Sequence, residues 1–104
     1  INETSPSLPA YESEFDHAGL ARAPSTTVEP PRVAGVAAAF ECERHEIIRV
    51  GGNTLILGEV VHAMVRDDVT TDGKADTSKL DVVGRLAGST YDRVTDRFEL
   101  ERPD

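Results

Sequence analysis

The sequence predicts a mainly β protein, an antiparallel β-barrel or sheet that carries one or two short helices. Two runs rich in β-branched residues, 33–50 and 54–65, flank Gly51-Gly52-Asn53, and this arrangement is typical of a β-hairpin. The length of 104 residues suits one small domain, and 38% hydrophobic residues without Trp predict a thin core of Val, Ala, Leu and Ile. Two strands are too few to close a barrel, so further strands must complete it.

A short helix is expected ahead of the hairpin. Tyr11, Phe15 and Ala18 follow one another at helical spacing, with acidic residues early in the stretch. Gly19 then stands where the end of a helix favours a left-handed residue, and Leu20 can supply the hydrophobic contact that follows such a cap. The helix is therefore predicted to end at Ala18.

Prolines and polar residues predict irregular or extended chain on both sides of this helix. Residues 1–9 are expected to form a loop, and 21–32 an extended connector. Within the second strand of the hairpin, Gly58 predicts a bulge or a bend, as at the corner of a barrel.

Beyond the hairpin, the signals are weaker. The acidic stretch 67–77 lacks the spacing of a calcium-binding loop and is expected to be a solvated loop. Leu80, Val83 and Leu86 stand three residues apart, which predicts a single helical turn. Phe98 and Leu100 alternate with charged residues, which predicts a last short strand.

The charge balance excludes several classes of partner. The chain has 11 Lys and Arg against 19 Asp and Glu, a formal net charge of −8, whereas nucleic acids and anionic membrane surfaces require a basic patch. The longest apolar run, 33–40, is far too short to span a bilayer, and no signal-peptide pattern opens the chain. The single cysteine, Cys42, cannot form an internal disulfide, which favours a reducing compartment. We therefore expect a cytoplasmic protein that binds neither nucleic acid nor membrane.

The titratable side chains give no sign of a metal site or of covalent catalysis. His17, His45 and His62 lie at unrelated spacings, without a cysteine or a second histidine at a metal-ligand offset. His62 stands among apolar residues of the second strand, where it either packs within the fold or lines a ligand cavity. Cys42 has no nucleophile signature and is expected to be a small core residue.

The stretch 84–91, Gly-Arg-Leu-Ala-Gly-Ser-Thr-Tyr, combines residues that suit an anionic, planar ligand. Arg85 supplies a charge-assisted fork for phosphate. Gly88 permits close approach of the backbone, and Tyr91 offers a flat face or a hydroxyl group. Clusters of Gly, Ser and Thr are also common in turns, and the usual glycine motifs for nucleotides are missing. The residues alone leave both interpretations open.

Seven short motifs follow one another along nearly the whole chain: Asn2-x-Thr4-Ser5, Glu14-Phe15-x-x-Ala18-Gly19-Leu20, Pro31-Arg32-Val33, Glu41-Cys42, Gly51-Gly52-x-Thr54-Leu55-x-Leu57-Gly58-Glu59-Val60, Gly84-Arg85-Leu86-x-Gly88-x-x-Tyr91 and Phe98-Glu99-Leu100-x-Arg102-Pro103. In this order they resemble the C-terminal half of the flavin reductase-like proteins of the FMN-binding split-barrel superfamily. No single motif is specific, and Ala87 stands where the family commonly has a glycine.

The resemblance implies a homodimeric split β-barrel that binds FMN and reduces it with NADH or NADPH, in many members for a partner monooxygenase. Arg85, Gly88 and Tyr91 would then lie beside the flavin, and His62 would line the same cleft. The isoalloxazine carries the hydride, so the resemblance assigns no catalytic acid, base or nucleophile to this chain.

Full family members are longer, and their N-terminal half, which carries the principal flavin contacts, has no counterpart here. Residues 1–104 are therefore interpreted as the C-terminal portion of the domain, to be completed by the N-terminal half of the same protein or by another chain. Two alternatives stay open. One is a non-enzymatic interaction or structural subunit that pairs through β-strand edges, and the other is a flavin or haem binder for storage or sensing.

Overall fold

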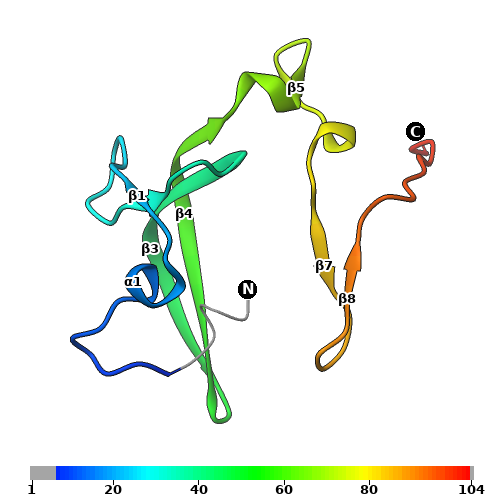
Figure 1. Cartoon of the computed structure of the whole chain (residues 1–104). Coiled ribbons are helices and arrows are strands. Elements are labelled where there is room, and N and C mark those ends of the chain that lie inside the picture. Colours follow the sequence, from blue (N-terminus) through cyan, green and yellow to red (C-terminus); the bar gives the residue numbers. More distant parts are fainter. Residues whose placement is uncertain (1–6, 104) are drawn as a thin grey trace. The chain divides into compact units, whose positions relative to one another are not determined.

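The computed structural model describes residues 7–103, in which strands predominate over helices (Figure 1). The chain divides into two compact units, 1–64 and 65–104, and each is considered by itself. The first holds helix α1 (Glu14–Ala18) and strands β1 (Arg22–Ala23), β2 (Arg32–Val33), β3 (Ala38–Val50) and β4 (Asn53–Val65). The second holds the 3₁₀ helices η2 (Asp67–Val69) and η3 (Thr77–Lys79) and strands β5 (Thr70–Thr71), β6 (Lys74–Ala75), β7 (Val83–Arg85) and β8 (Tyr91–Arg93).

The strands pair into four two-stranded sheets, and no closed barrel forms within residues 7–103. The prediction of a mainly β protein with short helices is confirmed. Residues 7–9 have no regular secondary structure, as expected, whereas the rest of the predicted loop and the first of the seven motifs lie outside the described residues.

Helix α1 begins later than the apolar spacing predicts, because Ser13 caps it. The Ser13 hydroxyl oxygen accepts a hydrogen bond from the Phe15 backbone N–H at 3.2 Å, and Ser13 itself is extended. The first helical residue is therefore Glu14. Tyr11 lies outside the helix in a turn, 87% exposed, so its predicted place in the helix is wrong.

The predicted end of the helix is confirmed. Gly19 adopts the left-handed conformation with φ of 69°. Its N–H donates to the carbonyl of Asp16 at 3.3 Å, and the N–H of Leu20 donates to the carbonyl of Phe15 at 2.9 Å. These two bonds form a Schellman cap, which satisfies carbonyl groups that the helix itself leaves free.

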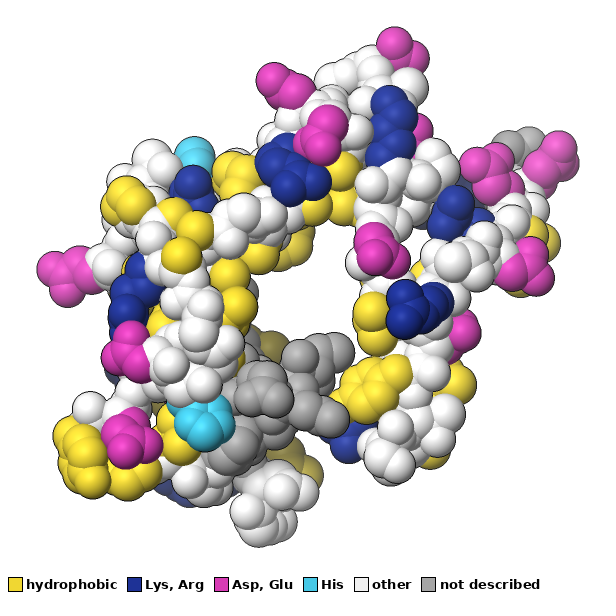
Figure 2. Space-filling view, in the orientation of Figure 1, with side chains coloured by type: hydrophobic (Ala, Val, Ile, Leu, Met, Phe, Trp, Pro, Cys, Tyr) yellow, Lys and Arg dark blue, Asp and Glu magenta, His cyan; other side chains and the backbone are white. Residues whose placement is uncertain are grey.

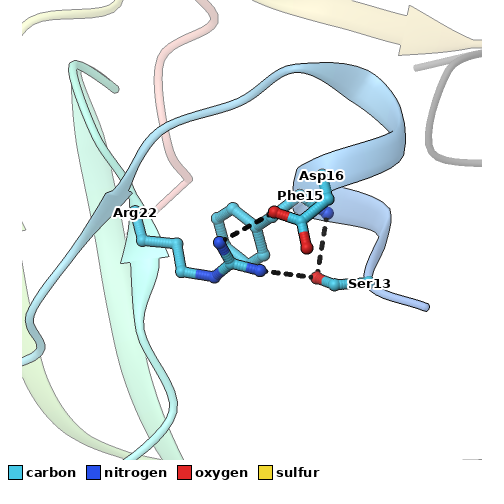
Figure 3. Close-up of polar contacts among 4 residues, drawn as sticks. All are labelled: Ser13, Phe15, Asp16 and Arg22. Carbon is cyan, nitrogen blue, oxygen red and sulfur yellow. Dashed lines mark hydrogen bonds and ion pairs between the residues drawn. The ribbon is translucent and has the colours of Figure 1, made fainter. Parts of the chain in front are cut away.

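Arg22 connects α1 to β1, as Figure 3 shows. Its guanidinium donates to Asp16 Oδ1 and to Ser13 Oγ, both at 3.0 Å. The same group lies 4.9 Å from the centre of the Phe15 ring, within the range of a cation–π contact. The predicted connector 21–32 is extended only near its ends, which pair antiparallel as β1 and β2 with Arg22 opposite Val33, whereas residues 26–30 form bends that reverse the chain.

The long hairpin predicted from the two β-branched runs is formed by β3 and β4. The strands are hydrogen-bonded neighbours joined by Gly51 and Gly52. Gly51 has φ of 59°, as the first position of a type II′ hairpin turn requires. Strand β3 begins at Ala38 rather than at Val33, because Val33 pairs in β2 and Gly35, with φ of 80°, turns the chain between them.

Gly58 lies where β4 approaches β3 closely. A Cβ atom added at Gly58 would be 3.1 Å from the Cβ atom of Cys42, closer than ordinary van der Waals contact. Cys42 is exposed, so its predicted place in a core is wrong. Glycine at position 58 allows this close approach, because a side chain there would require Cys42 to move by a few tenths of an ångström.

The acidic stretch 67–77 is a hairpin rather than a loop. Thr70 pairs with Ala75, and Thr71 with Lys74. Between them, Asp72 and Gly73 have φ of 53° and 76°, the two positive values that a type I′ turn requires. The Asp-Gly dipeptide was the sequence signal for this turn.

Two predictions for the last third of the chain are wrong. The segment spaced as Leu80, Val83 and Leu86 is not a helical turn, because residues 83–85 form β7 and pair with β8. Phe98 lies outside any strand and is 82% exposed. The strand that pairs with β7 is β8, residues 91–93. The alternation of apolar and charged residues around Phe98 and Leu100 therefore does not mark a strand.

The described residues bury little apolar surface. Within them, Val69 is the one buried hydrophobic residue, and Glu41 is the one buried charged residue. Hydrophobic side chains are instead open at the surface (Figure 2). On β4, Leu55 is 51% and Ile56 65% exposed, and successive strand residues face opposite sides. Both faces of the hairpin therefore present apolar surface that a covering partner would stabilise.

No helix among residues 7–103 has the length and apolar character that a membrane crossing requires.

Candidate functional site

The turn between β7 and β8 brings three of the predicted site residues together. Arg85 ends β7 and is paired with Tyr91, which begins β8. Gly88 lies within the turn with φ of 58°, a left-handed conformation that favours glycine. The N–H of Leu86 donates to the carbonyl of Thr90 at 3.0 Å and closes the loop. Local backbone pairing thus places Arg85, Gly88 and Tyr91 around one turn.

The side chain of Arg85 folds over this turn. Its Nη2 donates to the carbonyl of Gly88 at 3.1 Å, and its guanidinium carbon lies 6.0 Å from the centre of the Tyr91 ring. The first contact fixes the charged group beside the glycine, and the second places it over an aromatic face. Because a guanidinium has five N–H donors, several remain for an anion beside the Tyr91 ring.

His62 lies on β4, in the first unit, whereas Arg85, Gly88 and Tyr91 belong to the second. His62 is half-buried. Within its own unit, the charge of His62 favours the ionised form of Glu41. A common site for His62 and the β7–β8 turn stays a prediction.

Glu41 is a buried side chain to which the sequence analysis assigned no role. It is 4% exposed, and its carboxylate accepts three backbone hydrogen bonds. Oε2 accepts from the N–H of Thr26 at 2.8 Å, and Oε1 accepts from Thr27 at 2.6 Å and from Val28 at 3.2 Å. The Thr26 N–H, followed by those of Thr27 and Val28, lowers the pKa of this carboxyl, although burial acts in the opposite direction. Glu41 is therefore held as a carboxylate that fixes the segment 26–28.

The sequence carried one indirect signal for this role. Glu41 stands between Phe40 and Cys42 in a strand, and a carboxylate between two apolar residues needs hydrogen-bond donors if it is buried. The donors come from a segment 13 to 15 residues earlier, on a different element. No local pattern indicates which backbone groups those would be.

The side chains of residues 7–103 form no group of three or more His, Cys, Asp or Glu residues that could hold a metal ion.

The family model described as a flavin reductase like domain matches residues 1–81. The chain belongs to the flavin reductase-like family. An uncharacterised protein of Halalkalibacterium halodurans is 38% identical over 109 aligned residues, which cover 99% of this chain and 52% of that protein. The chain thus spans about half the length of the relatives that it matches.

Solved structures show the same fold. Nitrilotriacetate monooxygenase component B from Bacillus cereus is similar with a TM-score of 0.87 and 32% identity, over 96% of this chain and 52% of that one. A Shewanella frigidimarina protein with a split barrel domain is similar with a TM-score of 0.83 and 25% identity, over 98% of this chain and 53% of that one. The split-barrel prediction is confirmed, and the chain corresponds to part of such a domain.

The β7–β8 turn of this flavin reductase-like chain fits a flavin nucleotide in its donor set. Arg85 provides N–H donors for a phosphate, and the Tyr91 ring provides a flat apolar face. At Gly88 nothing lies within 4 Å of an added Cβ atom, so the backbone there is open to an approaching ligand.

Proposed function

We propose that this chain is the C-terminal half of an FMN reductase that uses NADH or NADPH. The observation that carries the proposal is the turn in which Arg85, Gly88 and Tyr91 meet, in a chain of the flavin reductase-like family. FMN combines a phosphate group with a planar ring, which are the two features that an arginine fork and an aromatic face recognise. The similarity to a monooxygenase component further supports transfer of reduced flavin to a partner monooxygenase.

In this proposal, the residues of the chain bind and orient, and the flavin, when bound, accepts the hydride. Arg85 is held by its hydrogen bond to Gly88, so its charge lies ready at the turn before the phosphate arrives. Tyr91 shields one side of the ligand from water, and Gly88 lets the backbone come close. His62 is proposed as an additional contact. No proton transfer by a side chain of this chain is required.

The proposed enzyme needs more than this chain. Exposed apolar side chains such as Leu55 and Ile56 on β4 support a complex with the N-terminal half of the domain, from the same protein or from another chain, and assembly as a homodimer. The excess of acidic residues and the lone Cys42 support a cytoplasmic protein without nucleic-acid or membrane partners.

The proposal is tested by an intact mass and an absorbance spectrum on one sample, followed by NADH and NADPH oxidation after FMN is added. A second polypeptide that co-purifies with a flavin spectrum, together with NAD(P)H oxidation, is the expected result. A lone chain that neither binds added FMN nor gains activity with the complementary half would overturn the proposal.

The exposed β3–β4 hairpin favours one alternative function, that of a non-enzymatic subunit which pairs with another chain through its strands. This alternative predicts a colourless protein that forms oligomers. Flavin binding without NAD(P)H oxidation would instead indicate storage or sensing.

A further inference from the structure

A separate pocket lies in the first unit, where α1, the proline-rich segment 25–33 and the start of β3 meet. Its volume is about 300 Å³. Most of the side chains around it are apolar: Phe15, Val28, Pro30, Pro31, Val33 and Phe40. A volume of this size is at the lower end of the range for small-molecule sites, which are typically apolar with few polar groups. The pocket therefore has the size and the walls for a single ring.

Among the described residues that line this pocket, Arg32 is the one cation. Its Nη1 donates to the carbonyl of Pro24 at 3.4 Å, a long and weak contact, and the described residues provide its guanidinium with no other hydrogen bond. The remaining N–H groups are therefore available to an acceptor. Glu41 also lines the pocket, but its two oxygens already accept three backbone N–H groups. Arg32 is thus the charged group with unused hydrogen-bonding capacity.

The pocket wall is fixed in advance. Glu41 binds the backbone of Thr26, Thr27 and Val28, and the Ser25 hydroxyl donates to the carbonyl of Pro30 at 2.5 Å. Prolines within the segment restrict its backbone further. A preformed wall reduces the entropy lost on binding, so even a small ligand retains affinity.

We propose that this pocket binds a small aromatic carboxylate. The ring lies against the apolar wall formed by Phe15, Val28 and Phe40, where burial of apolar area and ring contacts stabilise it. The carboxylate accepts N–H groups of Arg32, since a guanidinium matches a carboxylate in charge and in planar geometry. None of the residues that line this pocket is among those proposed to contact the flavin.

The test is a titration of this chain with benzoate, followed through backbone amide chemical shifts at constant ionic strength. We expect saturable shifts that concentrate in residues 25–33 and 40–42. Benzamide, which has the same ring without the charge, should bind at least about tenfold more weakly, because hydrogen bonds to charged groups are the stronger ones. Equal affinities, shifts scattered over the chain, or no saturation would overturn the proposal.

Two variants locate the charge. Arg32→Gln should weaken benzoate binding by about tenfold or more, whereas Arg44→Gln makes the same charge change on β3 outside the pocket and should leave it unchanged. Equal losses in both variants would indicate a general charge effect and would overturn the site. If the Arg32→Gln variant unfolds, as loss of its dispersed spectrum would show, the comparison of benzoate with benzamide on the wild-type chain still tests whether the ligand's charge contributes to binding. Since neither measurement uses flavin, failure here leaves the proposed reductase function untouched, and the reverse also holds.

Discussion

The carboxylate of Glu41 lies 2.6 Å from the backbone nitrogen of Thr27, fourteen residues earlier in the chain. The same side chain accepts N–H groups from Thr26 and Val28, so one buried charge satisfies three consecutive backbone donors. These residues belong to the segment between β1 and β2, which has few backbone partners of its own. A single side chain of β3 thus provides the hydrogen bonds that a loop cannot form within itself.

The substitution Glu41→Gln should release this segment. The amide that replaces the carboxylate is neutral and has one acceptor oxygen instead of two, so it cannot hold all three N–H groups. We expect amide hydrogen exchange at Thr26, Thr27 and Val28 to become about tenfold faster or more, while the β3–β4 hairpin remains protected. Glu43→Gln, two residues away on the same strand, is the control. Unchanged exchange in Glu41→Gln would contradict the role given to this carboxylate.

The contacts that sequence reasoning predicted are the local ones. The cap at Gly19 and the turn at Gly51 depend on residues within a few positions, and glycine is needed there because φ is positive. Glu41 depends on a segment on another element, which no local pattern specifies. Val83 shows how tertiary pairing overrides spacing, because its position three residues from Leu80 fits a helical turn until β8 is available as a partner.

In the candidate site, too, the sequence predicted the arrangement of residues that are close along the chain and not that of distant ones. Arg85, Gly88 and Tyr91 are close in the sequence, and a five-residue hairpin loop is enough to bring them together. His62 was considered as a cavity residue from its apolar neighbours, and the resemblance placed it in the flavin cleft; the structure assigns it to the first unit. Glu41 entered the sequence analysis only as part of the Glu41-Cys42 motif, because its hydrogen-bond partners lie on a distant segment and no local pattern identifies them.

The stability of the second unit should fall in acid because of Asp76. Its carboxylate accepts the hydroxyl groups of Ser78 at 2.6 Å and Thr71 at 2.7 Å and the Ser78 N–H at 2.9 Å. The Ser78 hydroxyl, and then the other donors and the Lys79 charge, lower the pKa of Asp76 from 3.8 to about 2. Because the pKa of Asp76 is lower in the folded state than in the unfolded state, its ionised carboxylate stabilises the fold. This stabilisation is fully present above about pH 3.8 and is lost as the pH falls toward about 2.

Urea unfolding of the wild type and of Asp76→Asn measures this contribution. The wild type should be the more stable at neutral pH, and the difference should shrink as the pH falls toward about 2. Asp72→Asn serves as the control, because asparagine also tolerates the positive φ found there. A stability difference between wild type and Asp76→Asn that does not vary with pH would argue against this assignment.

The substitution Gly58→Ala should destabilise the β3–β4 hairpin. The new Cβ atom would lie 3.1 Å from the Cβ atom of Cys42, so Cys42 must shift by a few tenths of an ångström to admit it. Overpacking of this kind costs about 1–3 kcal/mol. Gly52→Ala is the matched control, because an added Cβ atom there meets nothing within 4 Å. The measurement is the free energy of unfolding in urea, and equal values for the two variants would show that the strands yield without cost.

The substitution Arg85→Gln should weaken FMN binding in the protein assembled from both halves. It removes the charged fork that Gly88 holds in place and that lies over Tyr91. A loss of about tenfold or more in affinity is expected from a missing charge-assisted contact. Arg93→Gln changes the same charge at the far end of the β7–β8 pair and should have little effect. FMN titrations monitored through quenching of flavin fluorescence measure the affinity of both variants. Equal losses of affinity would show that Arg85 is not part of the site.

The exposed tip of the β3–β4 hairpin should make the isolated chain associate with itself. Residues 50–58 contain no Asp, Glu, Lys or Arg, and Ile56 is 65% exposed within this stretch. A net charge of −8 keeps copies of the chain apart elsewhere, so contact through an uncharged apolar segment meets the least repulsion. Ile56→Lys should therefore lower the apparent mass in size-exclusion chromatography with light scattering, whereas Thr54→Lys, which adds the same charge at a polar position, should lower it less. A wild-type chain that is monomeric at high concentration would mean that this surface is tolerated in water and requires no covering partner.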